Sequence, residues 1–204
     1  MAVEHRQTNK IYAVKVFDKK EISKKDKDIE CLKNEIAILR KLDSDTVCKF
    51  YEVHETINEI YLVLEYMKGG FIFDHGKVKK YGLPAVVHCI KSILQSLAYL
   101  NQINVMHRDL KPSNIMFEEK EPNLESSPIK LIDFGLSAFL GQHDYVFKRC
   151  GTPGFVAPEV IKTRETDDLA YDCKCDVYSV GIIMYYMLSG ILPFNHPDVK
   201  KTIM

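Results

Sequence analysis

The sequence lacks an excess of either charge. Its 28 lysine and arginine residues balance 28 aspartate and glutamate residues, so the 204-residue chain is formally neutral at pH 7. Proteins that bind nucleic acid usually carry a basic excess, so this balance argues against a nucleic-acid partner. A basic run at 19–27 is interrupted by Glu21 and Asp26, and we interpret it as a solvated loop.

Cysteine pairs with metal-ligand spacing are also missing. Six cysteines are scattered along the chain, and the pair Cys173 and Cys175 has no second pair that could complete a zinc site. No apolar signal segment opens the sequence, which favours a reducing compartment. We therefore expect a cytoplasmic protein.

Long unbroken apolar runs are absent as well. The most apolar stretch, 177–192, contains Ser179, Gly181, Ser189 and Gly190. It falls short of the roughly 18 apolar residues that a membrane-spanning helix needs, so we expect a buried core helix and no membrane partner. The 46% apolar content is enough for one sizeable core or two small ones.

The first third of the chain places two opposite charges on apolar faces. Residues 11–17 alternate as a strand does, with Lys15 inside it. The residues that follow include Ile29, Leu32, Ile36 and Leu39 at helical spacing, and Glu35 lies on their apolar face. A lysine in a buried strand costs free energy unless it has a partner, which favours a Lys15–Glu35 ion pair. The alternative is that both side chains extend to water.

The character of the chain changes after residue 70. A second strand at 60–66 is followed by Gly69 and Gly70, a break or hinge. Beyond it, apolar residues at helical spacing predict helices over 86–100 and 177–188. Strands early and helices late predict an α+β chain with two lobes, a strand-rich lobe at 1–66 and a helical lobe at 67–204.

Four motifs then occur in a fixed order. They are Ala13-Val14-Lys15, His107-Arg108-Asp109 followed by Lys111 and Asn114, Asp133-Phe134-Gly135, and Ala157-Pro158-Glu159. In this order they resemble the signature set of protein kinases. The resemblance extends over essentially the whole chain and implies a bilobal kinase fold.

The resemblance implies transfer of the γ-phosphate of ATP to protein hydroxyls with Mg²⁺ as cofactor. It assigns Asp109 as the base that orients the substrate hydroxyl and Lys111 as the residue that steadies the γ-phosphate. Asn114 and Asp133 would be the oxygen ligands of Mg²⁺. Lys15 would hold the α- and β-phosphates and be placed by Glu35.

Further positions gain roles by the same resemblance. The backbone from Glu65 to Met67 would bind adenine, Leu64 would be the gatekeeper, and Ala13 and Met116 would sandwich the ring. A stacked apolar spine would join the lobes, formed by Leu39, Phe50, His107 and Phe134. Asp176 resembles the buried aspartate that holds the catalytic loop, and the alternative is a helix N-cap.

Several stretches narrow the family. Lys111 together with Gly151-Thr152-Pro153 is typical of serine/threonine kinases. The stretches DFGLSAFL, CGTPGFVAPEVI and KCDVYSVGIIMYYMLSGILPF are most similar to the calcium/calmodulin-dependent and calcium-dependent protein kinases. The resemblance therefore implies protein substrates with serine or threonine, and regulation by a calcium sensor outside this segment.

The sequence also departs from the family pattern. A Gly-rich loop would lie before Met1 and further helices after residue 204, so we expect an N- and C-terminally truncated domain. Phe71 and Ser113 stand where acids would select arginine in a substrate, and Lys148 stands where a phosphothreonine is usual. These departures leave an alternative open, a catalytically dead pseudokinase that acts as a binding or scaffold module.

Overall fold

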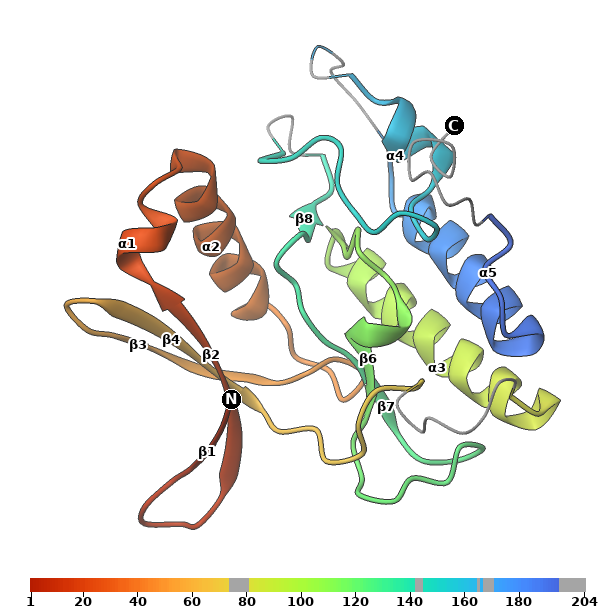
Figure 1. The fold of residues 1–204 in the computed structure, drawn as a ribbon, viewed down its shortest axis with the longest axis horizontal. Helices are drawn as coiled ribbons and strands as arrows, with labels where there is room; N and C mark the ends of the chain where they lie inside the picture. The colour runs from red at the N-terminus through yellow and green to blue at the C-terminus, as the bar shows by residue number, and fades with distance from the viewer. Residues whose placement is uncertain (74–80, 142–144, 165, 167–170, 195–204) are drawn as a thin grey trace.

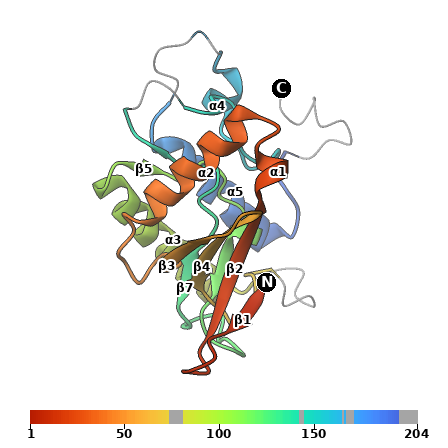
Figure 2. The ribbon, with the colours of Figure 1, turned by 90° about the vertical axis from the view of Figure 1, so that its left-hand side faces the viewer.

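The first part of the chain forms an antiparallel sheet. The computed structural model describes residues 1–73, 81–141, 145–164, 166 and 171–194. Its four-stranded sheet has the order β1-β2-β4-β3, and its strands are β1 (Ala2–Glu4), β2 (Ile11–Asp18), β3 (Phe50–Glu55) and β4 (Glu59–Glu65). Figure 2 shows the strands in this order across the sheet. The predicted strands at 11–17 and 60–66 are confirmed to within one residue.

The basic run at 19–27 is not a loop, so that prediction is wrong. It contains helix α1 (Lys19–Ile22) and the beginning of helix α2 (Asp26–Leu39). The side chain of Asp18 accepts a hydrogen bond from the N–H of Lys20 at 2.7 Å and caps α1. Asp26 and Asp28 lie in the first turn of α2, where negative charge stabilises a helix. These caps outweigh the charge pattern that suggested a loop.

Helix α2 has the orientation that its spacing predicts. Leu32, Ile38 and Leu39 are buried, and Glu35 on the same face is 4% exposed. The helix lies between the sheet and the short strand β8 (Figure 1). It therefore presents Glu35 to both the sheet and the second part of the molecule.

The second part is mainly helical, as predicted. Its elements are α3 (Leu83–Gln102), β5 (Val105–Met106), the 3-10 turn η1 (Pro112–Asn114), β6 (Ile115–Phe117), β7 (Ile129–Leu131), β8 (Ala138–Phe139), α4 (Pro158–Lys162) and α5 (Lys174–Ser189). Two small antiparallel strand pairs, β5 with β8 and β6 with β7, accompany the helices, and Figure 1 shows β6 and β7 beside α3. Gly190, with φ 78°, ends α5 in a left-handed cap. The division between the lobes at 66/67 stays a prediction.

One hydrophobic cluster connects the two parts. It extends from Leu39 of α2 through Phe134 to Ile93 of α3 and Ile183 of α5. Phe50 packs against it, and the rings of His107 and Phe134 lie 5.1 Å apart. These contacts bring all four residues of the predicted spine into or beside the shared core.

Helix α3 is long and apolar enough to cross a membrane by length and composition alone. The stretch 177–192, for which a buried core helix was predicted, supplies most of α5. Seven side chains of α3 are buried, and the helix packs against α5 and β7. Because core helices meet the same criteria, α3 is weak evidence for a membrane span.

Candidate active site

The backbone of the loop after β5 is hydrogen-bonded to a buried carboxylate. Asp176, in the first turn of α5, is 2% exposed. Its two oxygens accept hydrogen bonds from the backbone N–H groups of His107 and Arg108, both at 2.8 Å. Burial raises the pKa of Asp176, while His107 and the two N–H donors act in the opposite direction. The N-cap of α5 is Cys173, so the alternative reading of Asp176 as an N-cap is wrong.

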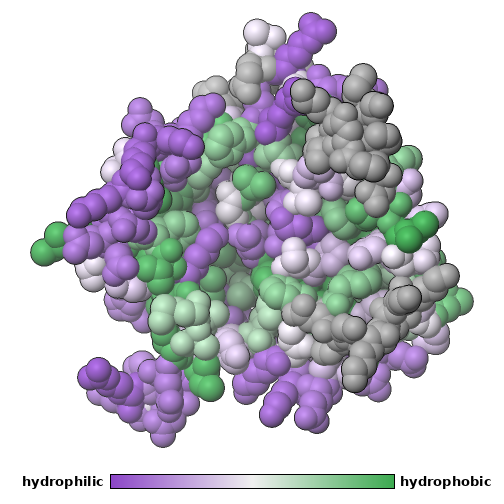
Figure 3. All heavy atoms as spheres, in the orientation of Figure 1, coloured by the Kyte–Doolittle hydropathy of each residue, from purple (hydrophilic) through white to green (hydrophobic). Residues whose placement is uncertain are grey.

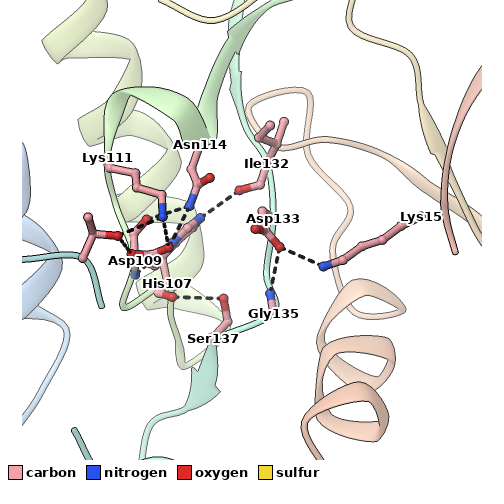
Figure 4. A network of polar contacts seen from close by, with 10 residues as sticks. Lys15, His107, Asp109, Lys111, Asn114, Ile132, Asp133, Gly135 and Ser137 are labelled. Atoms are coloured by element: carbon pink, nitrogen blue, oxygen red, sulfur yellow. Dashed lines mark hydrogen bonds and ion pairs between the residues drawn. The ribbon is translucent and has the colours of Figure 1, made fainter. Parts of the chain in front are cut away.

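Asp109 is oriented by three neighbouring side chains (Figure 4). Thr152 donates its hydroxyl to Oδ1 at 2.6 Å. Lys111 donates from Nζ to Oδ2 of Asp109 at 2.7 Å and to the hydroxyl of Thr152 at 2.8 Å. Asn114 donates from Nδ2 to the backbone C=O of Asp109 at 2.8 Å and to Oδ2 at 3.2 Å. A carboxylate has about four lone-pair positions, so Asp109 can still accept a hydrogen bond from an incoming hydroxyl.

Lys15 reaches the same cleft from the sheet. Its Nζ lies 2.8 Å from Oε1 of Glu35 and 3.0 Å from Oδ1 of Asp133. The predicted Lys15–Glu35 pair is therefore present, and Asp133 is a second partner. Burial acts against the charge of Lys15, but the two carboxylates together raise its pKa. Burial raises the pKa of Glu35. Burial also acts to raise the pKa of Asp133, but the charge and hydrogen bond of Lys15, together with the N–H of Gly135, outweigh it and lower that pKa.

Two residues of the site have a left-handed backbone conformation, which is unfavourable for residues other than glycine. Arg108 has φ 66° and Asp133 has φ 60°, both in the left-handed region. Residues other than glycine rarely adopt it, and such strain concentrates at functional sites. Each of the two is adjacent to or part of a predicted catalytic motif.

Asn114 and Asp133 are placed to share a cation. The N–H of Ile132 donates to the backbone C=O of Asn114 at 2.9 Å. This hydrogen bond brings the next residue, Asp133, close to Asn114. The hydrogen bonds of these side chains to described residues use Oδ1 of Asp133 and Nδ2 of Asn114. This leaves Oδ2 of Asp133 and Oδ1 of Asn114 available as oxygen ligands for a cation. Hard oxygen donors of this kind suit Mg²⁺.

The described part of the chain offers no larger cluster of metal-binding side chains at this point. Among the residues that the structure describes, no cluster of three or more His, Cys, Asp or Glu side chains could hold a metal ion. Mg²⁺ is usually bound through one or two carboxylates together with substrate phosphates. The donors present fit a metal that arrives with, and is shared by, a phosphorylated ligand.

A cavity of about 360 Å³ lies between the sheet and β6. Its lining includes the predicted adenine-binding positions, Ala13, Leu64, Glu65, Met67 and Met116. Met67 is 5% exposed, and within the described residues its backbone N–H and C=O have no hydrogen-bond partner. Buried backbone groups are rarely left unpaired. A ligand with a donor and an acceptor at its edge, such as adenine, fits this cavity.

A larger cavity of about 600 Å³ lies beside it. Lys15, Glu35, Asp109, Asp133 and Phe147 are among the residues that line it. Figure 3 shows hydrophilic side chains gathered in the hollow between the two parts of the molecule, with apolar side chains around them. The phosphate-binding and catalytic candidates therefore face one cleft.

An ion pair at the hinge escaped the sequence analysis. Nζ of Lys130 lies 2.8 Å and 3.0 Å from the two carboxylate oxygens of Glu65, and 3.5 Å from Glu118. The family resemblance predicted only that the backbone of Glu65 would bind adenine, and no partner was predicted for its side chain. The signal was available, because Lys130 lies in the apolar run IKLI and a lysine in a buried strand needs a partner.

Helix α2 is also tied directly to the segment after Asp133. Nδ2 of Asn34 donates to the backbone C=O of Ser137 at 2.7 Å. The hydroxyl of Ser137 donates in turn to the C=O of His107 at 3.2 Å (Figure 4). The position of Glu35 is thereby linked to the loop that carries Asp109.

Comparison with known proteins identifies relatives of the whole sequence. The family model for the protein kinase domain matches residues 1–204. The chain is 38% identical over 206 residues to calcium-dependent protein kinase 5 of Plasmodium berghei (strain Anka), which covers 98% of this chain and 34% of that protein. It is 37% identical over 206 residues to myosin light chain kinase A of Dictyostelium discoideum, which covers 98% of this chain and 66% of that protein. The chain thus spans between one third and two thirds of the length of these relatives.

Proposed function

Since this chain belongs to the protein kinase family, we propose that its protein transfers the γ-phosphate of ATP to serine and threonine hydroxyls of other proteins. The observation that carries the proposal is the arrangement around Asp109. Its carboxylate is held by Lys111, Thr152 and Asn114 at the floor of a cleft that Lys15 and Asp133 also line.

Asp109 acts on the substrate hydroxyl. Because Thr152 and Lys111 fix its two oxygens, the carboxylate can accept a hydrogen bond from an incoming hydroxyl in one orientation. A positioned acid or base of this kind typically contributes about 10²- to 10⁴-fold to a rate. The ammonium group of Lys111 lies 2.7 Å from the carboxylate of Asp109, where its charge would also stabilise the transferred phosphate.

The nucleotide is held from the other side of the cleft. Adenine would fill the 360 Å³ cavity, with its polar edge at the backbone of Met67. Lys15 would bind the phosphates, and Asn114 and Asp133 would hold Mg²⁺, which neutralises phosphate charge when bound. The ion pair of Lys15 with Glu35 keeps the ammonium group directed into the cleft.

The finer assignment concerns substrates and regulation. Relatives named as calcium-dependent and myosin light chain kinases support protein substrates and control by a calcium sensor in a segment outside these residues. Phe71 and Ser113 stand where acids would select arginine, so we propose weak dependence on an upstream arginine in the substrate. The six cysteines are free thiols, which supports a cytoplasmic location.

The pseudokinase alternative is not favoured. Pseudokinases usually lose the strand lysine or one of the two aspartates, whereas Lys15, Asp109 and Asp133 are all in place and paired. No described contact around Asp109 is one that would block a substrate hydroxyl.

The test is phosphoryl transfer by the full-length protein. The protein is incubated with γ-labelled ATP, Mg²⁺ and peptides that differ only in the acceptor residue, which is serine, threonine or tyrosine. We expect label on serine and threonine peptides and not on tyrosine peptides. The matched control is Asp109→Asn, which keeps the size of the side chain and removes its charge. Wild-type transfer no greater than that of the variant, with nucleotide binding intact, would contradict the proposal.

A further inference from the structure

Tyr171 is a buried tyrosine between α4 and α5 whose hydroxyl has two close oxygen and nitrogen partners and a longer contact with the thiol of Cys150 at 4.0 Å. It is 8% exposed, accepts a hydrogen bond from Nη1 of Arg108 at 3.0 Å, and donates to the C=O of Lys148 at 2.9 Å. Burial raises the pKa of this phenol, so it stays protonated and can act as donor and acceptor at once. Tyr171 therefore joins the His-Arg-Asp motif to the segment that follows the Asp-Phe-Gly motif.

Arg108 is held by oxygen atoms without formal charge. Nε donates to the C=O of Leu136 at 2.6 Å and Nη1 to the C=O of Phe147 at 2.8 Å, and the guanidinium lies 4.9 Å from the ring centre of Tyr145. None of the ion pairs among the described residues includes Arg108. Within the part of the chain that the structure describes, the partners of this buried cation are therefore carbonyls and phenols.

The segment held by Tyr171 leads directly to Asp109. Gly151 has φ 108°, and a Cβ atom there would come within 2.9 Å of the C=O of Arg108, so the two backbones are in close contact. The next residue, Thr152, donates to the carboxylate of Asp109 at 2.6 Å. A shift of the segment at Lys148 is therefore transmitted within four residues to the orienting group of the catalytic base.

We propose that Tyr171 is a positioning residue, whose hydroxyl couples Arg108 to the C=O of Lys148 and so fixes Thr152 against Asp109. The role in catalysis rests on the proposed function, whereas the structural coupling does not. It implies that neutral hydrogen bonds hold the segment 147–152 in place, without an added phosphate group.

Tyr171→Phe is the direct test, because it removes both hydrogen bonds and keeps the ring. The carbonyl that Tyr171 holds belongs to Lys148, whose peptide bond is a trypsin site. We expect tryptic cleavage after Lys148 to accelerate about tenfold, since a hydrogen bond to a charged group is lost and cleavage requires local opening. Cleavage after Lys120, in an exposed turn, serves as the internal reference.

The matched control is Tyr178→Phe. Tyr178 lies on α5, is partly buried, and packs against the small hydrophobic cluster that contains Tyr171, but its hydroxyl has no hydrogen bond to the described residues. We expect this variant to cleave at the wild-type rate. Equal cleavage after Lys148 in wild type and Tyr171→Phe would overturn the proposal, whether or not the protein transfers phosphate.

Kinetics then test the consequence for catalysis. We expect Tyr171→Phe to lower kcat about tenfold and to leave the KM for ATP within twofold of wild type, because Thr152 acts on Asp109 and not on the nucleotide cavity. Arg108→Lys should have a similar effect, and the double variant should be no slower than either single variant. Additive losses, or a change confined to KM, would overturn the positioning role. An inactive wild type would count against the proposed function instead.

Discussion

The two sides of the cleft are held in different ways. On the helical side, Asp109 and the Asp176 beneath it are at most 9% exposed, and every partner described for their carboxylates comes from the same lobe. On the sheet side, the Lys15 and Asp133 side chains are 37% and 47% exposed, and their ion pair crosses between lobes. The proposed catalytic base, Asp109, is thus fixed by its own lobe. Lys15, the proposed phosphate-binding residue, depends on how the sheet, α2 and the helical lobe sit together.

Replacing each of the two cleft aspartates, Asp109 and Asp133, in turn should separate catalysis from binding, with the largest expected effect. Asp109→Ala should lower turnover about 10²- to 10⁴-fold and leave nucleotide affinity within twofold, since Asp109 contacts the acceptor side of the cleft. Asp133→Ala should remove Mg²⁺-dependent nucleotide binding. Steady-state kinetics and calorimetry with and without Mg²⁺ measure both. Normal turnover in Asp109→Ala would refute the division between an aspartate that acts in catalysis and one that acts in nucleotide binding.

The anchoring of the catalytic loop is tested at Asp176. Asp176→Asn keeps one acceptor oxygen but places an N–H donor against a backbone N–H, so we expect the free energy of unfolding to fall by about 2–4 kcal/mol. Asp172→Asn is the control, because Asp172 accepts from the N–H of Lys174 at the surface. Denaturant titration should show a loss below about 1 kcal/mol there. Equal losses would mean that the buried anchor has no special role.

Acidification should break the two ion pairs of Lys15 in a defined order. Burial raises the pKa of Glu35 above 4.5, whereas Lys15 keeps that of Asp133 below 3.8. Glu35 therefore favours the folded state most below pH 4.5, and this contribution is lost as pH rises through its raised pKa. The contribution of Asp133 is present above pH 3.8 and is lost as pH falls through its lowered pKa.

Carboxyl NMR resolves the two titrations separately. Glu35 should titrate above its ordinary range and Asp133 below its own. In Glu35→Gln the upper titration should disappear and the lower one remain. The reverse order of protonation would show that the sheet-side charges are not coupled as the contacts imply.

The smallest effect is expected at the tether between α2 and the helical lobe. Asn34→Ala removes the hydrogen bond to the C=O of Ser137, and we expect nucleotide affinity to fall about threefold to tenfold, in line with about 1 kcal/mol for a neutral hydrogen bond. The exposed neighbour Lys33 provides the control variant Lys33→Ala. Combined with Glu35→Gln, the Asn34 effect should largely vanish, because Asn34 acts through the placement of Glu35. Fully additive effects would argue against that route.

Local sequence periodicity predicts contacts between side chains on the apolar faces of neighbouring elements, but it does not predict hydrogen bonds between distant segments. The period of two in β2 and the helical spacing in α2 predicted that Lys15 and Glu35 would face each other, and the structure places their atoms 2.8 Å apart. The contacts of Asn34 with Ser137 and of Arg108 with Tyr171 join residues 103 and 63 positions apart, through backbone carbonyls and a hydroxyl. Neither periodicity nor motif spacing encodes such contacts, since they depend on how complete elements dock. The basic run at 19–27 was misjudged because capping by Asp18 is decided by one side chain.

The ion pair between Lys15 and Asp133 makes nucleotide loading an exchange of partners. A phosphate that approaches Lys15 meets an ammonium group that already has two carboxylates beside it, and Asp133 has a cation before any metal arrives. Each charge that the ligand brings therefore replaces an internal one, and only the difference between the two contributes to affinity.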